Sequence, residues 1–107
     1  LHGEGVAIGC ALAFDLSQRL GLCSQEAPSR VRAHLRAMGM KAKLADIPGP
    51  LPDADALMGL MANDKKARDG RIAFVLADDI GRARVVRDAD PAQARAVLAQ
   101  ALAERGA

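Results

Sequence analysis

A nearly unbroken apolar run near the start of the chain limits most strongly what this sequence can fold into. Residues 4–20 read EGVAIGCALAFDLSQRL and turn polar only from Asp15 onward. A segment of this kind predicts a helix that is buried on most sides at its start and exposed at its end. Gly5 and Gly9 share one face of that helix, so another group could pack or bind closely there. Gly21 predicts where the helix ends.

The core must be built almost entirely from aliphatic side chains. Of the 107 residues, 50% are hydrophobic but only 2% are aromatic, namely Phe14 and Phe74. This composition predicts one folded domain with closely packed helices. Single-stranded nucleic acids are bound on aromatic platforms, and the net charge of +2 gives little attraction to phosphate backbones. We therefore expect no nucleic-acid partner.

Three further helices are indicated by their capping residues. The second begins after Ser24, its expected N-cap, with Pro28 in its first turn. The third begins at Asp53, and the last begins at Asp90 with Pro91 in the first helical position. Inward-facing positions are expected at Val31, Leu35 and Met38 on the second helix and at Leu57, Leu60 and Met61 on the third. A basic outer face of the second helix is expected from Arg30, Arg32, His34 and Arg36.

Between the last two helices the chain changes character. The run from Ile72 to Ala77 is rich in β-branched residues and predicts a buried strand, and Arg82 to Val86 can return as its antiparallel partner. The fold class expected is therefore mainly α, with one short β-hairpin near residues 72–87.

Several other classes are disfavoured. No apolar run approaches the length of a membrane-spanning helix, and the N-terminus does not resemble a signal peptide, so we expect a soluble, cytoplasmic protein with no membrane partner. Cys10 and Cys23 lack the spacing of a disulfide scaffold or a metal site, and we expect both to be small buried apolar residues. The chain starts at Leu1 inside an apolar stretch, which suggests a piece of a longer protein.

Few residues are candidates for a catalytic or metal-binding role, and each of them could instead be an ordinary surface residue. His2, near Glu4 at a helix start, could ligate a metal or bind an anion, or could be an ordinary surface histidine. Catalytic zinc usually takes three protein ligands, so other ligands would have to come from elsewhere. Lys65 and Lys66 could reach into a cleft as charges for phosphate or carboxylate, or could simply be solvated. His34 is expected to be solvated.

Three motifs, in this order and spacing, resemble the C-terminal part of the 3-dehydroquinate synthase family. They are Leu1–Gly9 (LHGEGVAIG), Asp64–Lys66 (DKK) followed by Gly70, and Phe74–Leu76 (FVL) followed by Ile80–Gly81. The first motif is specific to sugar phosphate cyclases, while the others are individually weak. The resemblance covers essentially the whole chain.

The resemblance implies an enzyme of the shikimate pathway, and hence of aromatic amino acid biosynthesis. It would convert 3-deoxy-D-arabino-heptulosonate 7-phosphate to 3-dehydroquinate and phosphate, using catalytic NAD and a divalent metal, Zn²⁺ or Co²⁺. It implies that His2 is a metal ligand, that the other ligands lie upstream, and that Lys65, or alternatively Lys66, contacts the substrate.

The resemblance also implies how the chain is organised. Residues 1–107 would form the helical C-terminal domain, inactive by itself, of an enzyme that is usually a homodimer. The Rossmann-like N-terminal domain that binds NAD would be absent and would pack on an apolar surface of the first helix. The alternatives are another sugar phosphate cyclase, of the inosose- or valiolone-forming type, or a small helical interaction or nucleic-acid-binding domain without catalysis.

Overall fold

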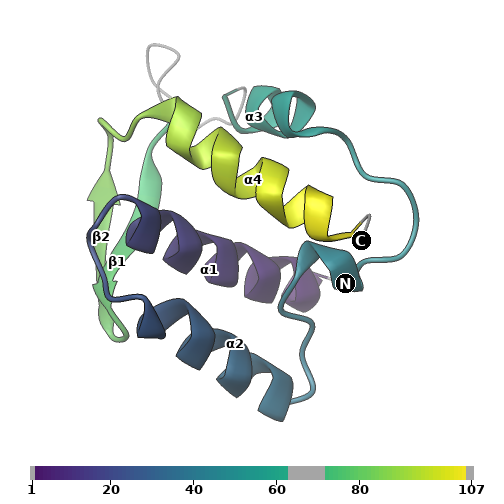
Figure 1. Cartoon of the computed structure of the whole chain (residues 1–107), viewed down its shortest axis with the longest axis horizontal. Coiled ribbons are helices and arrows are strands. Elements are labelled where there is room, and N and C mark those ends of the chain that lie inside the picture. The colour runs from purple at the N-terminus through teal and green to yellow at the C-terminus, as the bar shows by residue number, and fades with distance from the viewer. Residues whose placement is uncertain (1, 63–71, 106–107) are drawn as a thin grey trace.

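The computed structural model describes residues 2–62 and 72–105, without the side chains of residues 2–4 and 105. Its helices are α1 (His2–Arg19), α2 (Glu26–Ala37), the short 3₁₀ helix η1 (Leu44–Asp46), α3 (Ala54–Ala62) and α4 (Pro91–Arg105), and its strands are β1 (Phe74–Asp79) and β2 (Arg82–Val86). Helix α1 lies between α2 and α4, the hairpin packs against α1, and α3 packs on α4 (Figure 1). The expected fold class, mainly α with one short β-hairpin, is confirmed.

Helix α1 ends as its sequence predicts, but only part of its start is buried, and its last turns are not fully exposed. Gly21 has a φ of +77°, and the backbone N–H of Leu22 donates to the Ser17 carbonyl at 2.8 Å, which closes the last turn. Leu16 and Ser17, near this end, are buried. Near the start, Val6 is 51% exposed. Ala7, Ile8 and Ala11 are buried as expected, whereas the face that carries Val6 and Cys10 is open because no described residue covers it.

The start of α2 also differs from the prediction. The N-cap is Gln25, which makes no side-chain capping bond, and Ser24 contributes only its carbonyl oxygen, which accepts from Ala27 N–H at 3.3 Å. Pro28 lies in the first turn, as expected, and is buried. Met38 is exposed because it stands at the C-cap, beyond the part of α2 that packs on α1.

The caps of α3 and α4 are confirmed. Asp53 Oδ1 accepts from Ala56 N–H at 2.8 Å, and Asp90 Oδ1 accepts from Ala92 N–H at 2.9 Å, so each aspartate satisfies an otherwise free helix donor. The expected inward position of Leu60 is wrong, since this side chain is 63% exposed. Met61 packs against the core as expected, and Met58 does so as well.

The hairpin supplies much of the core. Strand β1 begins at Phe74, two residues later than predicted, and pairs antiparallel with β2. Phe74 and Leu76 alternate inward and join Leu16 of α1 and Ala94 of α4 in one buried cluster. Gly81, at φ +85°, allows the tight turn. Within the described part of the chain, no helix is long and apolar enough to cross a bilayer.

Candidate functional site

The predicted metal ligand is the first residue of α1. His2 therefore stands at the positive end of a helix of 18 residues, although the structure does not describe its imidazole. Lys65 and Lys66 lie outside the described residues. Ala62 and Ile72 are the described residues on either side of positions 63–71. Both line a groove of about 600 Å³ beside the start of α4.

An open face of small residues follows His2 along α1. Gly5, Val6, Gly9 and Cys10 are all exposed, and a Cβ added at either glycine would meet nothing within 4 Å. The prediction that Cys10 is buried is wrong because this face carries no covering element from the described chain. The surface has the small, apolar character expected where another domain packs closely.

The described side chains do not form a complete metal site by themselves. Among the side chains that the structure describes, no three His, Cys, Asp or Glu groups are close enough together to hold a metal ion. The open helix start fits the addition of ligands from another part of a larger protein.

Cys23 plays a structural part. It is half-buried, and its Sγ donates to the Phe14 carbonyl at 3.8 Å. Burial raises the pKa of this thiol, and the negative charges of Asp79, Asp15 and Asp78 raise it further. The thiol is therefore protonated at neutral pH and is a poor nucleophile.

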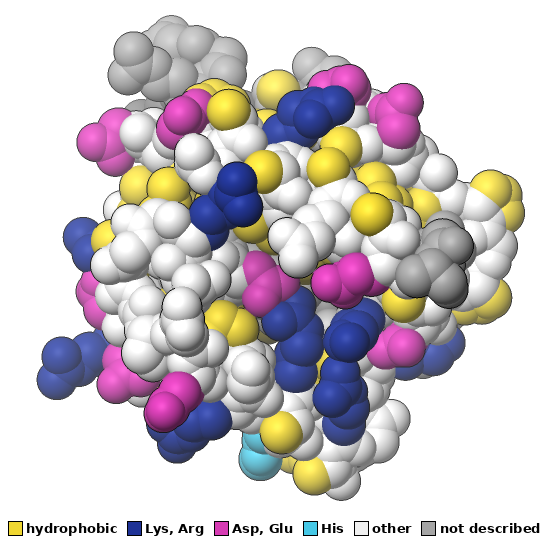
Figure 2. All heavy atoms as spheres, in the orientation of Figure 1, with side chains coloured by type: hydrophobic (Ala, Val, Ile, Leu, Met, Phe, Trp, Pro, Cys, Tyr) yellow, Lys and Arg dark blue, Asp and Glu magenta, His cyan; other side chains and the backbone are white. Residues whose placement is uncertain are grey.

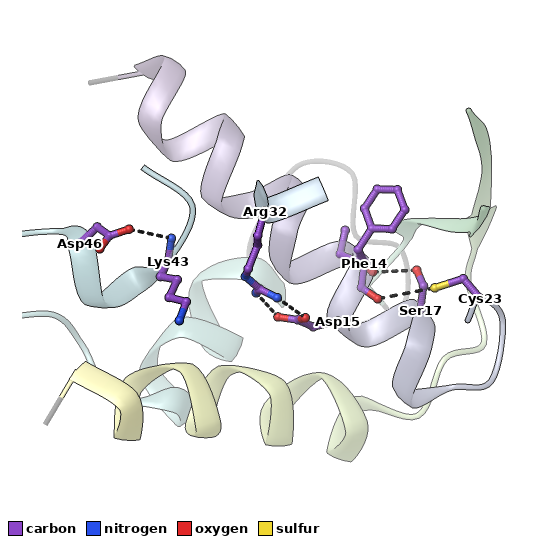
Figure 3. Close-up of polar contacts among 8 residues, drawn as sticks. Phe14, Asp15, Ser17, Cys23, Arg32, Lys43 and Asp46 are labelled. Atoms are coloured by element: carbon purple, nitrogen blue, oxygen red, sulfur yellow. Dashed lines mark hydrogen bonds and ion pairs between the residues drawn. The ribbon is translucent and has the colours of Figure 1, made fainter. Parts of the chain in front are cut away.

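A polar centre that the sequence analysis missed joins α1 to α2. Arg32 Nη1 donates to Asp15 Oδ1 at 2.6 Å, and Arg32 Nη2 donates to Asp15 Oδ2, so the two planar groups meet in a bidentate pair (Figure 3). Their side chains are only 18% and 28% exposed, respectively. The hydrogen bonds to Asp15 raise the pKa of Arg32 above its usual value; burial opposes this rise, and the charges of Asp15 and Glu104 add to it.

Periodicity alone had assigned Arg32 to the solvated face of α2. The signal that could have corrected this assignment is Asp15, the acid that ends the apolar run of α1. A carboxylate on a largely buried helix needs a partner. The partner is 17 residues away, and no local pattern identifies it. His34, by contrast, is exposed as expected.

The Asp15–Arg32 pair lies in a groove of about 700 Å³ between α1, α2, η1 and α4. Figure 2 shows Lys and Arg side chains gathered beside acidic groups near the middle of one face of the molecule. The charged residues lining the groove are Asp15, Arg19, Arg32, Arg36, Lys43 and Glu104. Four cations and two carboxylates thus line this groove.

Comparison with known proteins identifies the family. The family described as 3-dehydroquinate synthase C-terminal matches residues 1–67. The 3-dehydroquinate synthase of Paracoccus denitrificans (strain Pd 1222) is 72% identical over 100 residues, which are 94% of this chain and 27% of that protein. The corresponding enzyme of Cereibacter sphaeroides (strain KD131 / KCTC 12085) is 69% identical over 105 residues, 98% of this chain and 28% of the relative.

A third relative gives the same result. The 3-dehydroquinate synthase of Ruegeria pomeroyi is 66% identical over 103 residues, 96% of this chain and 28% of the relative. The chain thus spans little more than a quarter of the length of these curated relatives. With a family match over 1–67 and this level of identity, the chain belongs to the 3-dehydroquinate synthase C-terminal family.

Proposed function

We propose that this chain is the C-terminal helical domain of an enzyme that converts 3-deoxy-D-arabino-heptulosonate 7-phosphate to 3-dehydroquinate and phosphate. The observation that carries the proposal is the family match, which begins at residue 1 and therefore includes His2, Lys65 and Lys66. The relatives named above are 3-dehydroquinate synthases, which supports this activity over that of other sugar phosphate cyclases. Nothing in the described residues favours a non-catalytic interaction domain.

The N-terminal end of α1 is proposed to contribute to the metal site. His2 would supply one ligand to Zn²⁺ or Co²⁺, and residues from the remaining three quarters of the enzyme would supply the others. When bound, NAD supplies reversible oxidation of a substrate alcohol, and the metal supplies polarisation of an alcohol oxygen. Gly5 and Gly9 would leave room beside His2 because neither carries a side chain.

The lysines are proposed to hold the substrate. Lys65, or alternatively Lys66, would place an ammonium group against an anionic group of the heptulosonate phosphate. A cation there would fix the orientation of the substrate and favour the departure of phosphate as an anion.

The remaining parts of the proposal concern the rest of the protein. A Rossmann-like N-terminal domain would bind NAD and pack on the open face of α1, where Val6 and Cys10 are exposed. The chain alone would then be inactive, and the full-length enzyme would be a cytoplasmic homodimer. An apolar face of this kind is stabilised when a second domain covers it.

The test is a comparison of substrates. The full-length protein, supplied with NAD and Zn²⁺, should release phosphate from 3-deoxy-D-arabino-heptulosonate 7-phosphate. A heptulose 7-phosphate without the carboxylate is the control, and we expect turnover of it to be slower by more than about 100-fold, because a site that pairs with a carboxylate rejects an analogue lacking it. Preference for the control substrate would show that the enzyme is a different sugar phosphate cyclase.

A further inference from the structure

The groove between α1, α2, η1 and α4 contains cations that the Asp15–Arg32 pair does not neutralise. Arg36 lies one turn after Arg32 on α2, and Lys43 directly precedes η1. Both line the groove. Among the described residues, neither side chain takes part in a hydrogen bond or an ion pair.

The charges around the groove are unbalanced. Four cationic side chains and two carboxylates line it, which leaves two positive charges in excess. Like charges that share a concave surface repel one another, and a bound anion relieves this repulsion. The excess matches the charge of a phosphate dianion.

The groove is held open by a fixed pair of residues. Asp15 binds Arg32 through both carboxylate oxygens, which sets the spacing of α1 and α2 and so the position of Arg36 one turn later. In Figure 3, the side chains of Arg32 and Lys43 both extend toward the side on which the yellow helix α4 lies, and both line the groove. The groove therefore needs little rearrangement to bind a ligand.

The size and lining of the groove favour a small, polar ligand. A volume of about 700 Å³ is in the range of small-molecule sites rather than of flat protein interfaces. Arginine binds phosphate through paired N–H groups, and lysine adds a compact charge. The neutral hydrogen-bonding groups available around these cations are those of Gln18, Ser29 and Gln100.

We propose that this groove binds a small phosphate-type dianion, with Arg36 and Lys43 as the direct contacts and the Asp15–Arg32 pair as the support behind them. The site lies along the C-terminal half of α1, whereas His2 begins that helix. The proposal goes beyond the synthase activity and does not depend on it.

The test is calorimetric titration of inorganic phosphate into the full-length protein and into the double variant R36A/K43A. We expect the variant to bind one phosphate fewer per chain, or to bind that phosphate at least about tenfold more weakly. Both side chains lack partners among the described residues, so the far-UV circular dichroism and the melting temperature should stay near those of the parent. The matched control is R30A/R82A, which removes the same charge from exposed positions outside the groove.

A second control separates this site from the proposed catalytic contacts. The variant K65A/K66A should keep the phosphate bound in the groove, and a failure of that variant to change substrate binding would count only against the proposed lysine role. Three results would overturn the groove proposal: no phosphate binding to the parent up to about 10 mM, identical binding by R36A/K43A, or an equal loss in R30A/R82A.

Discussion

The hydroxyl of Ser17 accepts a hydrogen bond from the backbone N–H of Ala77 at 2.9 Å and donates one to the Ala13 carbonyl at 2.7 Å. Ser17 is fully buried, so these two bonds satisfy both polar roles of its hydroxyl. This residue thereby joins α1 to the first strand of the hairpin. Its own carbonyl also closes the end of α1 by accepting from Leu22.

Replacing Ser17 with alanine should destabilise the chain by about 1–3 kcal/mol, because it leaves the Ala77 N–H buried without an acceptor. Urea denaturation followed by circular dichroism measures the change in the free energy of unfolding. Ser24→Ala is the matched control, since Ser24 is exposed and its side chain caps no helix. Equal stability of the two variants would contradict the assigned role of Ser17.

The Asp15–Arg32 pair should show strong coupling. Asp15→Leu alone leaves a largely buried guanidinium without its partner and should cost about 2–3 kcal/mol, somewhat less than for a fully buried pair because both groups retain some contact with water. The double variant D15L/R32M should lie within about 1 kcal/mol of the parent. A double-mutant cycle measures the difference, and additive effects of the two changes would contradict a direct interaction.

Asp55 gives a prediction on pH dependence. The hydrogen bond from Arg95, followed by the charge of Arg95, lowers the pKa of Asp55. A carboxylate with a lowered folded-state pKa stabilises the fold above its unfolded pKa, and this contribution is lost as the pH falls through the folded pKa. Asp55→Asn should therefore lower the melting temperature slightly at pH 7, with the difference disappearing below the folded pKa.

The Asp55–Arg95 pair is exposed, so salt should weaken it. Thermal melts of D55N and of the control D88N, compared at low and at about 1 M salt, check this point. A difference between D55N and the parent that persisted unchanged in acid would show that the ion pair is not its cause.

The two cysteines should differ in reactivity. In the 107-residue chain, iodoacetamide should modify Cys10 before Cys23, because Cys10 is exposed whereas Cys23 is half-buried with a raised pKa. In the full-length protein, we expect Cys10 to react more slowly than it does in the chain, because the proposed N-terminal domain would cover it. Mass spectrometry of timed samples measures both rates. An unchanged rate at Cys10 would place that domain elsewhere.

Local chemistry explains which parts of the fold could be predicted. The caps at Asp53 and Asp90 and the turn at Gly81 depend on residues within a few positions, and the sequence shows them directly. The Asp15–Arg32 pair depends on how two helices face each other, and periodicity placed Arg32 in solvent instead. Tertiary packing is the information that single-helix patterns lack.

The open face of α1 was expected only through the family resemblance, whereas the apolar pattern alone predicted a helix start buried on most sides. Apolar character at Val6 and Cys10 indicates that a surface avoids water, but it does not say which partner covers it. The described chain leaves that face open. The roles of His2, Lys65 and Lys66 stay predictions, since they depend on side chains that the structure does not describe.

The central claim, that His2 is a metal ligand of a 3-dehydroquinate synthase, is tested most directly by His2→Ala in the full-length protein. Bound zinc and phosphate release are measured together, with His34→Ala as the control because His34 is exposed on α2. We expect H2A to lose tight zinc binding and more than about 100-fold in rate while remaining folded, and H34A to keep both. Full zinc content and rate in H2A would contradict the claim.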